Sequence, residues 1–164
     1  MALDRKLAII DLSTGKIETK VIPLDLRKKF LGGRALDAYL LYNHTKKGCD
    51  PLGPGNTLLI SGGILTATCA SATARTHFMA KSPLTGLLGS ANMGGFFAPE
   101  LAWAGFHHLV IKGKAKKPVY IYIHNGEIEI RDAAYLWGKT TTETQWAIRE
   151  EMGDEEIKSC VIGP

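Results

Sequence analysis

The sequence predicts an α+β fold that is strand-rich, with two packed β-sheets and three or four short helices. Two observations carry this prediction. Short apolar runs, several with the period-two alternation of a half-buried strand, recur along the 164 residues between turns that use 18 glycines and seven prolines. These runs mostly follow one another instead of alternating with helical patterns, which fits packed sheets better than repeated βαβ units. A hydrophobic content of 45% is enough for the core of one domain.

The first third of the chain predicts a hairpin, two helices and a buried strand. Turn chemistry at Ser13-Thr14-Gly15 separates the two hairpin strands, and Pro23 ends the second one. Apolar residues at helical spacing, Leu36, Tyr39 and Leu40, mark the longer helix. The expected elements are strands over 7–12 and 16–22, a short helix capped by Asp25 and ending at Leu31, a helix over 34–44, a loop over 48–56 and a strand over 57–61.

The remainder predicts further strands and two more helices. Asn125-Gly126 lies between two alternating apolar runs and predicts a type I′ hairpin turn. Thr140 and Glu143 have the spacing of a capping box, and Gly153 stops the helix that they open. The expected elements are strands over 75–80, 87–90 and 109–112, hairpin strands over 119–123 and 127–130, helices over 97–104 and from Thr140 to Met152, and a last strand over 157–162.

The stretch from Arg75 to Glu100 holds the candidate site. Its small residues at 89–95 favour close approach of a turn, another backbone or a ligand, because each interior glycine costs roughly 0.5–1 kcal/mol relative to alanine. An antiparallel return of 87–90 along 75–80 brings Asn92 near Arg75. The guanidinium and the amide then suit an anion such as phosphate or carboxylate. A plain β-meander whose arginine reaches solvent explains the same residues and stays open as the alternative.

Two neighbouring features bear on this site. The helix expected over 97–104 follows Gly94-Gly95, and the N-terminus of a helix attracts anions. His77 shares the predicted face of Arg75. A strand histidine near a sheet end is more often packed or solvated than functional, so His77 is left out of the predicted site.

Composition excludes several classes of protein. The net charge of +4 and pI near 9.0 come from dispersed basic residues without interleaved aromatics, which argues against a nucleic-acid partner. Cys49, Cys69 and Cys160 are odd in number and far apart, so neither a disulfide framework nor a metal site of this chain is expected. No leader pattern and no run of eighteen apolar residues occurs, which predicts a soluble cytoplasmic protein without membrane contact.

Seven segments taken together resemble one known family. They are Gly32–Tyr42, Thr57–Thr68, Ala80–Gly86, Ala91–Phe106, Lys117–Ile123, Glu129–Lys139 and the final Val161–Pro164. Their sequences resemble the N-terminal domain of the aldehyde:ferredoxin oxidoreductases, which are tungsten enzymes with a bis-pterin cofactor. The resemblance covers nearly all of the chain in one order and is far more specific than a lone glycine motif.

The resemblance implies a domain of two β-sheets that forms a base for the tungsten bis-pterin. It implies that Arg75 contacts a pterin phosphate, that Asn92 is linked to the magnesium bridging the pterin phosphates, and that Gly94 is a further cofactor contact. No catalytic residue is implied in this chain. The family often has Thr-Gly-Gly-Arg before the strand, whereas 72–75 here read Ala-Thr-Ala-Arg, which adds methyl groups where the backbone approaches the pterin.

The resemblance also implies parts that these residues do not contain. In the family, later helical domains complete the site and hold a [4Fe–4S] cluster through cysteines that none of the three here matches. Residues 1–164 are therefore expected to be a tungstopterin-binding domain, incomplete at its C-terminal end and inactive alone. The complete enzyme would oxidise an aldehyde to a carboxylic acid and pass electrons to ferredoxin, with a homodimer considered among its assemblies. The sequence does not indicate which aldehyde, or whether the metal is tungsten or molybdenum.

A stand-alone, non-catalytic domain that acts as a cofactor carrier or an assembly partner is the alternative. The two hypotheses differ in the surface they predict. Missing domains would dock on an apolar surface, so exposure of Phe96, Phe97 or Trp103 would favour the enzyme.

Overall fold

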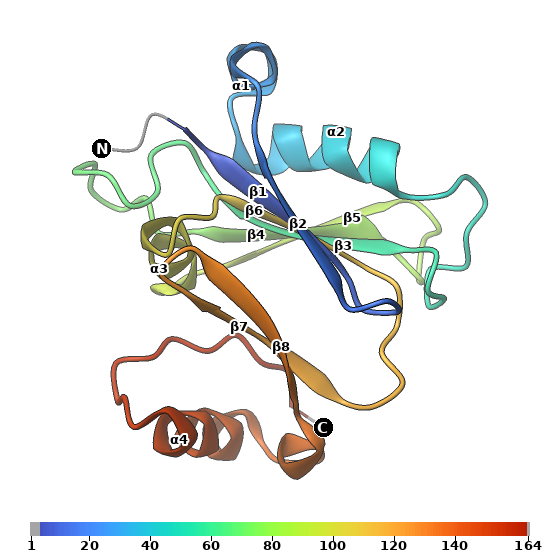
Figure 1. Cartoon of the computed structure of the whole chain (residues 1–164). Helices are drawn as coiled ribbons and strands as arrows, with labels where there is room; N and C mark the ends of the chain where they lie inside the picture. Colours follow the sequence, from blue (N-terminus) through green and yellow to red (C-terminus); the bar gives the residue numbers. More distant parts are fainter. Residues whose placement is uncertain (1–3, 164) are drawn as a thin grey trace.

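A six-stranded mixed sheet lies at the centre of the computed structural model, which describes residues 4–163 (Figure 1). Its strands are β1 (Lys6–Asp11), β2 (Lys16–Val21), β3 (Thr57–Gly62), β4 (Thr76–Lys81), β5 (Leu88–Met93) and β6 (His108–Lys112). Their order across the sheet is β2-β1-β6-β3-β4-β5. All neighbours are antiparallel except β1 and β6, which run parallel with Leu7 beside His108. This parallel pair was not predicted.

Two helices cover one face of this sheet. They are α1 (Leu24–Phe30) and α2 (Gly33–His44), and Figure 1 shows both above the strands. The side chains buried between them and the sheet are Leu7, Ile9, Ile22, Leu36, Leu40, Leu41, Leu59, Met79 and Val110. Gly33 has a φ of +52° and lies beside the end of β3, where an added Cβ would be in ordinary contact with the Gly63 Cα at 3.6 Å. The backbone conformation at the start of α2, and not a lack of space, therefore favours glycine.

The opposite face packs against a second, two-stranded sheet and one short helix. These are β7 (Val119–His124), β8 (Glu127–Asp132) and α3 (Phe97–Trp103). The buried side chains between them and the large sheet are Ala8, Ile10, Ile60, Leu101, Phe106 and Leu109. Asn125 and Gly126 both have positive φ, 47° and 87°, as a type I′ turn requires. The predicted hairpin is confirmed, and with it the α+β fold of two packed sheets.

The fourth layer is α4 (Thr141–Met152), preceded by a short 3₁₀ helix, η1 (Ala134–Leu136). Figure 1 shows α4 beneath the β7–β8 hairpin, on the side away from the large sheet. The capping box is present: the Thr140 side chain accepts from the Glu143 backbone N–H, and the Glu143 carboxylate accepts from the Thr140 N–H. Gly153 ends the helix at a φ of 63°. Both predicted ends of this helix are confirmed.

Two predicted features are wrong. No strand occurs at 157–162, because this extended segment has no hydrogen-bonded strand beside it among the described residues. The side chains of Ile157 and Val161 instead pack against a buried cluster formed by Ala133, Leu136 and Ile148. Asp25 is not the cap of α1 either. The N-cap position is Pro23, and Asp25 lies in the first turn, where its charge still favours the helix dipole.

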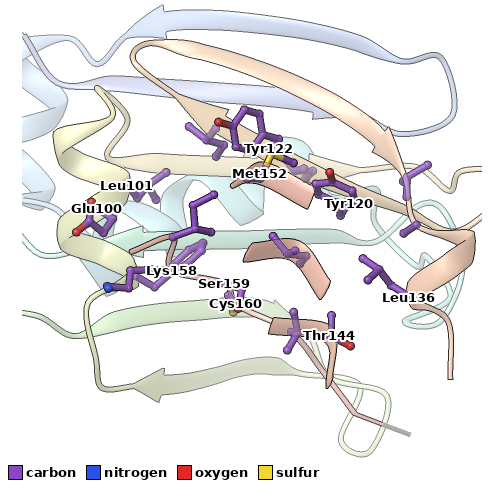
Figure 2. A pocket seen from close by; sticks show the side chains of 18 of the residues that line it. Glu100, Leu101, Tyr120, Tyr122, Leu136, Thr144, Met152, Lys158, Ser159 and Cys160 are labelled. Carbon is purple, nitrogen blue, oxygen red and sulfur yellow. The ribbon is translucent and has the colours of Figure 1, made fainter. Parts of the chain in front are cut away.

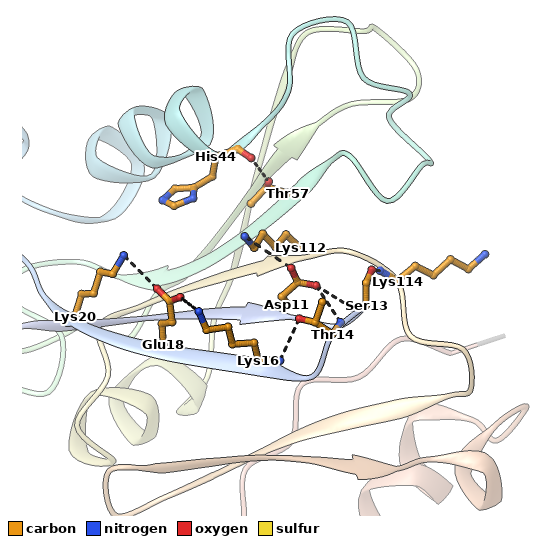
Figure 3. Close-up of polar contacts among 10 residues, drawn as sticks. All are labelled: Asp11, Ser13, Thr14, Lys16, Glu18, Lys20, His44, Thr57, Lys112 and Lys114. Carbon is orange, nitrogen blue, oxygen red and sulfur yellow. Dashed lines mark hydrogen bonds and ion pairs between the residues drawn. The ribbon is translucent and has the colours of Figure 1, made fainter.

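Polar contacts tie the first hairpin turn to the end of β6 (Figure 3). The Asp11 carboxylate accepts from the backbone N–H groups of Ser13 at 3.0 Å and Thr14 at 3.3 Å. The Ser13 hydroxyl accepts from the Lys114 N–H at 2.9 Å. Gly113 has a φ of +78°, and an added Cβ there would lie 2.5 Å from the Ser13 hydroxyl oxygen. Glycine is therefore required where the chain leaves β6.

Candidate functional site

The three residues predicted to bind cofactor meet at one end of the β4–β5 ladder. His77 pairs with Asn92 across these antiparallel strands. Continuing the same register by two residues places Arg75 opposite Gly94. Arg75, Asn92 and Gly94 are all exposed. The proximity predicted from the sequence is confirmed, since the turn at 82–87 folds β5 back along β4.

The side chains at this place belong to the helix-covered face of the sheet. Met79 packs under α1 and α2, and His77 lies on the same side of β4, two residues away. Cross-strand partners share a face, so Asn92 and Ser90 extend from this side of β5 as well. The helix α2 packs over β3 and β4, and it leaves Ser90 and Asn92 exposed beside it.

The outer side of β5 offers backbone groups. The Ser82 N–H donates to the Leu87 carbonyl at 2.8 Å. Because hydrogen-bonded and non-bonded pairs alternate in an antiparallel ladder, the N–H and C=O groups of Ser90 and Asn92 point away from β4. Among the described residues, no further strand pairs with this side of β5. A ligand there can use both the side chains on one face and the backbone at the edge.

The surroundings of these residues suit an anion that is approached closely. A Cβ added at Gly94 would meet nothing within 4 Å, so the space beside it is open. Gly95 has a φ of +97°, which disfavours any other residue there. The helix α3 is only seven residues long and packs through Leu101 against the opposite face of the sheet, so we assign no anion site to its N-terminus.

His107 and Arg5 lie at the same end of the sheet. His107 precedes β6, and its carbonyl accepts from the Gly62 N–H at the end of β3. The pKa of His107 is lowered to about 4, first by burial and then by the charge of Arg5. Burial and the neighbouring Arg27 lower the pKa of Arg5 as well.

The segment that leads from β3 to Arg75 is held by its own polar groups. Arg5 donates to the Ile64 carbonyl, and the Thr66 hydroxyl donates to the Thr73 carbonyl at 2.8 Å. Ala72 has a φ of 58°, a left-handed conformation that costs an L-residue about 1–2 kcal/mol. Ala72 is therefore a strained position in the segment that approaches Arg75.

A buried polar network beside the site was not predicted from the sequence. Asp37 on α2 is fully buried, and its carboxylate accepts from the Ser61 hydroxyl at 2.5 Å. Its two oxygens also lie 2.6 Å from Nδ1 of His77 and 2.8 Å from Nδ1 of His108. The other ring nitrogen of His77 is 2.9 Å from the hydroxyl oxygen of Ser90. The sequence contained one indication of this network: Asp37 lies within the apolar stripe of its helix. A carboxylate buried at such a position needs hydrogen-bonding partners.

A large cavity lies elsewhere. It has a volume of about 1050 Å³ and is lined by residues of α3, β7, α4 and 154–163 (Figure 2). Its lining includes Ile60 and Leu109, which face the second sheet, whereas Asn92 and His77 lie on the helix-covered face. Size alone would favour the cavity as the site. The wall of the cavity is mainly apolar. At Arg75 and Asn92, in contrast, a guanidinium, an amide and the unpaired backbone groups of β5 lie close together. We therefore place the candidate site at Arg75 and Asn92.

Comparison with known proteins bears on this placement. The family model described as "Aldehyde ferredoxin oxidoreductase, N-terminal domain" matches residues 7–164. The chain belongs to this family. It is 48% identical over 155 residues to the tungsten-containing aldehyde ferredoxin oxidoreductase of Pyrococcus furiosus, covering 94% of this chain and 26% of that protein. The enzyme of the same name from Thermococcus kodakarensis is 44% identical over 155 residues, with the same coverage.

A solved structure shares the fold. It is the active site complex BamBC of benzoyl coenzyme A reductase in complex with 1,5-dienoyl-CoA, with a TM-score of 0.89 and 35% identity over 92% of this chain and 23% of that one. This chain thus spans about a quarter of the length of the relatives that it matches.

Three further findings concern metals, thiols and membranes. Within residues 4–163, no group of three or more His, Cys, Asp or Glu side chains is placed to hold a metal ion. Cys49, Cys69 and Cys160 are free, and burial raises the pKa of the Cys160 thiol. None of the helices in the described part of the chain is long and apolar enough to span a bilayer.

Proposed function

We propose that this chain is the cofactor-binding N-terminal part of a tungsten-pterin, iron–sulfur aldehyde:ferredoxin oxidoreductase. One observation carries the proposal: Arg75, Asn92 and Gly94 come together on an exposed end of the sheet. The names of the relatives support tungsten and an aldehyde substrate. Because the chain spans about a quarter of their length, the activity belongs to a longer polypeptide or a complex, and these residues alone are inactive.

The residues present fit the phosphate end of a pterin cofactor. The Arg75 guanidinium would bind a phosphate of the cofactor, since its planar fork can bond two oxygens of one group. Asn92 would hold the magnesium, and Gly94 would leave room for the cofactor to approach the backbone. When bound, the tungsten pterin supplies the two-electron oxidation of the aldehyde. This chain contributes binding and orientation, and no general acid or base of the reaction is assigned to it.

The apolar surface supports the enzyme over a stand-alone domain. Phe96 is 64% exposed and Trp103 is 62% exposed, on the segment that follows the site. Exposed aromatic side chains of this kind suit the docking of further domains. Those domains would hold the [4Fe–4S] cluster and contact ferredoxin.

The enzyme would act in the cytoplasm of an anaerobic cell, and a homodimer is its proposed assembly.

The experiment is to purify, without oxygen, the native polypeptide that contains this sequence. Its mass, its tungsten, iron and pterin contents, and its reduction of a viologen dye by aldehydes are measured. Arg75→Ala and Asn92→Ala should each lower the pterin content at least tenfold. Arg149→Ala, on α4 beneath the hairpin, serves as the matched control and should retain the cofactor. A native protein of 17.8 kDa that binds no pterin would refute the proposal and favour the stand-alone domain.

A further inference from the structure

The two-stranded sheet has an open edge along β7, and this edge faces the large cavity. Every residue from Pro118 to Asn125 lines the cavity, whereas no residue of β8, which is described in full, does so. Successive side chains of a strand point to opposite faces, so a cavity that contacts all of them lies beside the edge of β7 and not over one face. Figure 2 shows Tyr120 and Tyr122 of β7 among the lining side chains.

The register of the hairpin shows which backbone groups this edge offers. The Ala133 N–H donates to the Pro118 carbonyl at 2.9 Å, so every second residue of β7 counted from Pro118 is in a hydrogen-bonded pair with β8. The N–H and C=O groups of Val119, Ile121 and Ile123 therefore point away from β8, on the side of the cavity. None of these backbone groups has a hydrogen-bonding partner within residues 4–163.

The two edges of this sheet differ in charge. The sequence of β8, EIEIRD, has four charged side chains in six residues. Charged side chains of this kind keep exposed edge strands from pairing with other strands. The sequence of β7, VYIYIH, has no carboxylate, lysine or arginine. An apolar edge without such protection indicates a strand that is covered in the complete protein.

A second extended segment lines the same cavity. Its residues 156–163 are in the wall without a break. The backbone of 157–163 forms no hydrogen bond to any part of the chain that the structure describes, although 157–161 are half-buried. Unpaired backbone groups are costly where water is excluded. A strand placed in the cavity would supply partners to β7 and to this segment together.

We propose that the free edge of β7 docks a β-strand of the polypeptide that directly follows residue 164 in the complete protein. The matching family model describes an N-terminal domain, and this chain spans about a quarter of the length of its relatives, so further polypeptide is available. Gly163 lines the cavity, and a connection of a few residues is enough to reach β7 from there. The docked strand would be apolar, because the wall that it meets is mainly apolar. The inference rests on the proposed function only in placing these residues in a longer polypeptide.

The first test is amide hydrogen exchange in the complete polypeptide, read at single residues by mass spectrometry with electron-transfer fragmentation. Ile121 and Ile130 are the matched pair, because they are cross-strand partners that pack on the same apolar cluster while their N–H groups point to opposite edges. Ile121 should exchange about a hundredfold more slowly than an unpaired amide, whereas Ile130 should exchange at a rate near that of an unpaired amide. Exchange of Ile121 at the unpaired rate would overturn the inference.

The second test identifies what occupies the cavity. Tyr122 is replaced by the photoreactive aromatic residue benzoylphenylalanine in the complete polypeptide, and the cross-linked peptides are sequenced. The probe should react with a peptide that follows residue 164 in the same polypeptide. The same replacement at Tyr42, which is 87% exposed on α2 over the other face of the large sheet, is the control and should not yield that peptide. Cross-links confined to residues 1–164 would contradict the docked strand, and cross-links between isotopically heavy and light copies would assign the edge to a second copy instead.

The outcomes separate this inference from the proposed function. A complete polypeptide that binds pterin but leaves the Ile121 amide unprotected would refute the docked strand alone. A polypeptide with the protected amide and the expected cross-link but no pterin would refute the proposed function alone. A native protein of 17.8 kDa that binds no pterin would refute both.

Discussion

Replacing Asp37 by alanine removes the one acceptor that three buried donors share. The carboxylate is fully buried and bonds Ser61, His77 and His108, which come from β3, β4 and β6. Hydrogen bonds to a charged group contribute about 1.5–3 kcal/mol each, but the buried charge also loses its hydration. Breaking a buried charged network by removing one partner typically costs about 3–5 kcal/mol, and we expect Asp37→Ala to lower the free energy of unfolding by that amount.

Urea denaturation followed by far-UV circular dichroism is the suitable assay. The three tryptophans are 59–79% exposed and would report unfolding poorly by fluorescence. With a urea dependence of about 2 kcal/mol per molar, the midpoint should fall by about 1.5–2.5 M. Asp25→Ala, at an exposed carboxylate in the first turn of α1, is the matched control and should cost no more than about 1 kcal/mol. A loss below about 1 kcal/mol for Asp37→Ala, at an unchanged slope, would refute the reasoning.

Three further predictions concern single positions. Thr140→Ala removes the capping box of α4 and should cost about 1 kcal/mol in urea denaturation, whereas Thr140→Ser should cost little. Ala72→Gly relieves a φ of 58° and should stabilise the chain by about 0.5–1 kcal/mol; a melting temperature that does not rise would contradict this. The folded-state pKa of His107 is about 4, against 6.5 as its ordinary value. The unfolded chain therefore binds more protons between these values, and stability should fall as the pH drops from about 6.5 to about 4. Allowing for solvent screening, this loss is on the order of 1–2 kcal/mol, and His107→Gln should remove it.

The features that the sequence predicted well are encoded locally. The Asn125-Gly126 turn and the cap of α4 depend on residues within three or four positions of each other, so their patterns are visible without the fold. The meeting of Arg75 and Asn92 was predictable for a related reason. They lie on two strands joined by a short turn, and antiparallel return alone brings them close.

What the sequence did not reveal depends on distant partners. Asp37 is 40 residues from His77 and 71 from His108, and no pattern of spacing connects them. The error at 157–162 has the same origin, because an apolar run becomes a strand only where another strand offers hydrogen bonds. The parallel pairing of β1 with β6 likewise required knowledge of the whole sheet.

The position of β6 in the sheet sets a condition on how the chain folds. This strand lies between β1 and β3, both of which precede it by many residues, and its pairing closes a loop of about one hundred residues with β1. Contacts so distant in sequence slow folding, because loop closure precedes their stabilisation. Until β6 is synthesised, the β1–β2 hairpin and the β3–β4–β5 meander are therefore not hydrogen-bonded to each other. The edges of β1 and β3 that β6 later covers are unpaired during this time. The sheet becomes continuous only after His108–Lys112 has left the ribosome, and until then chaperone contact with these edges is expected.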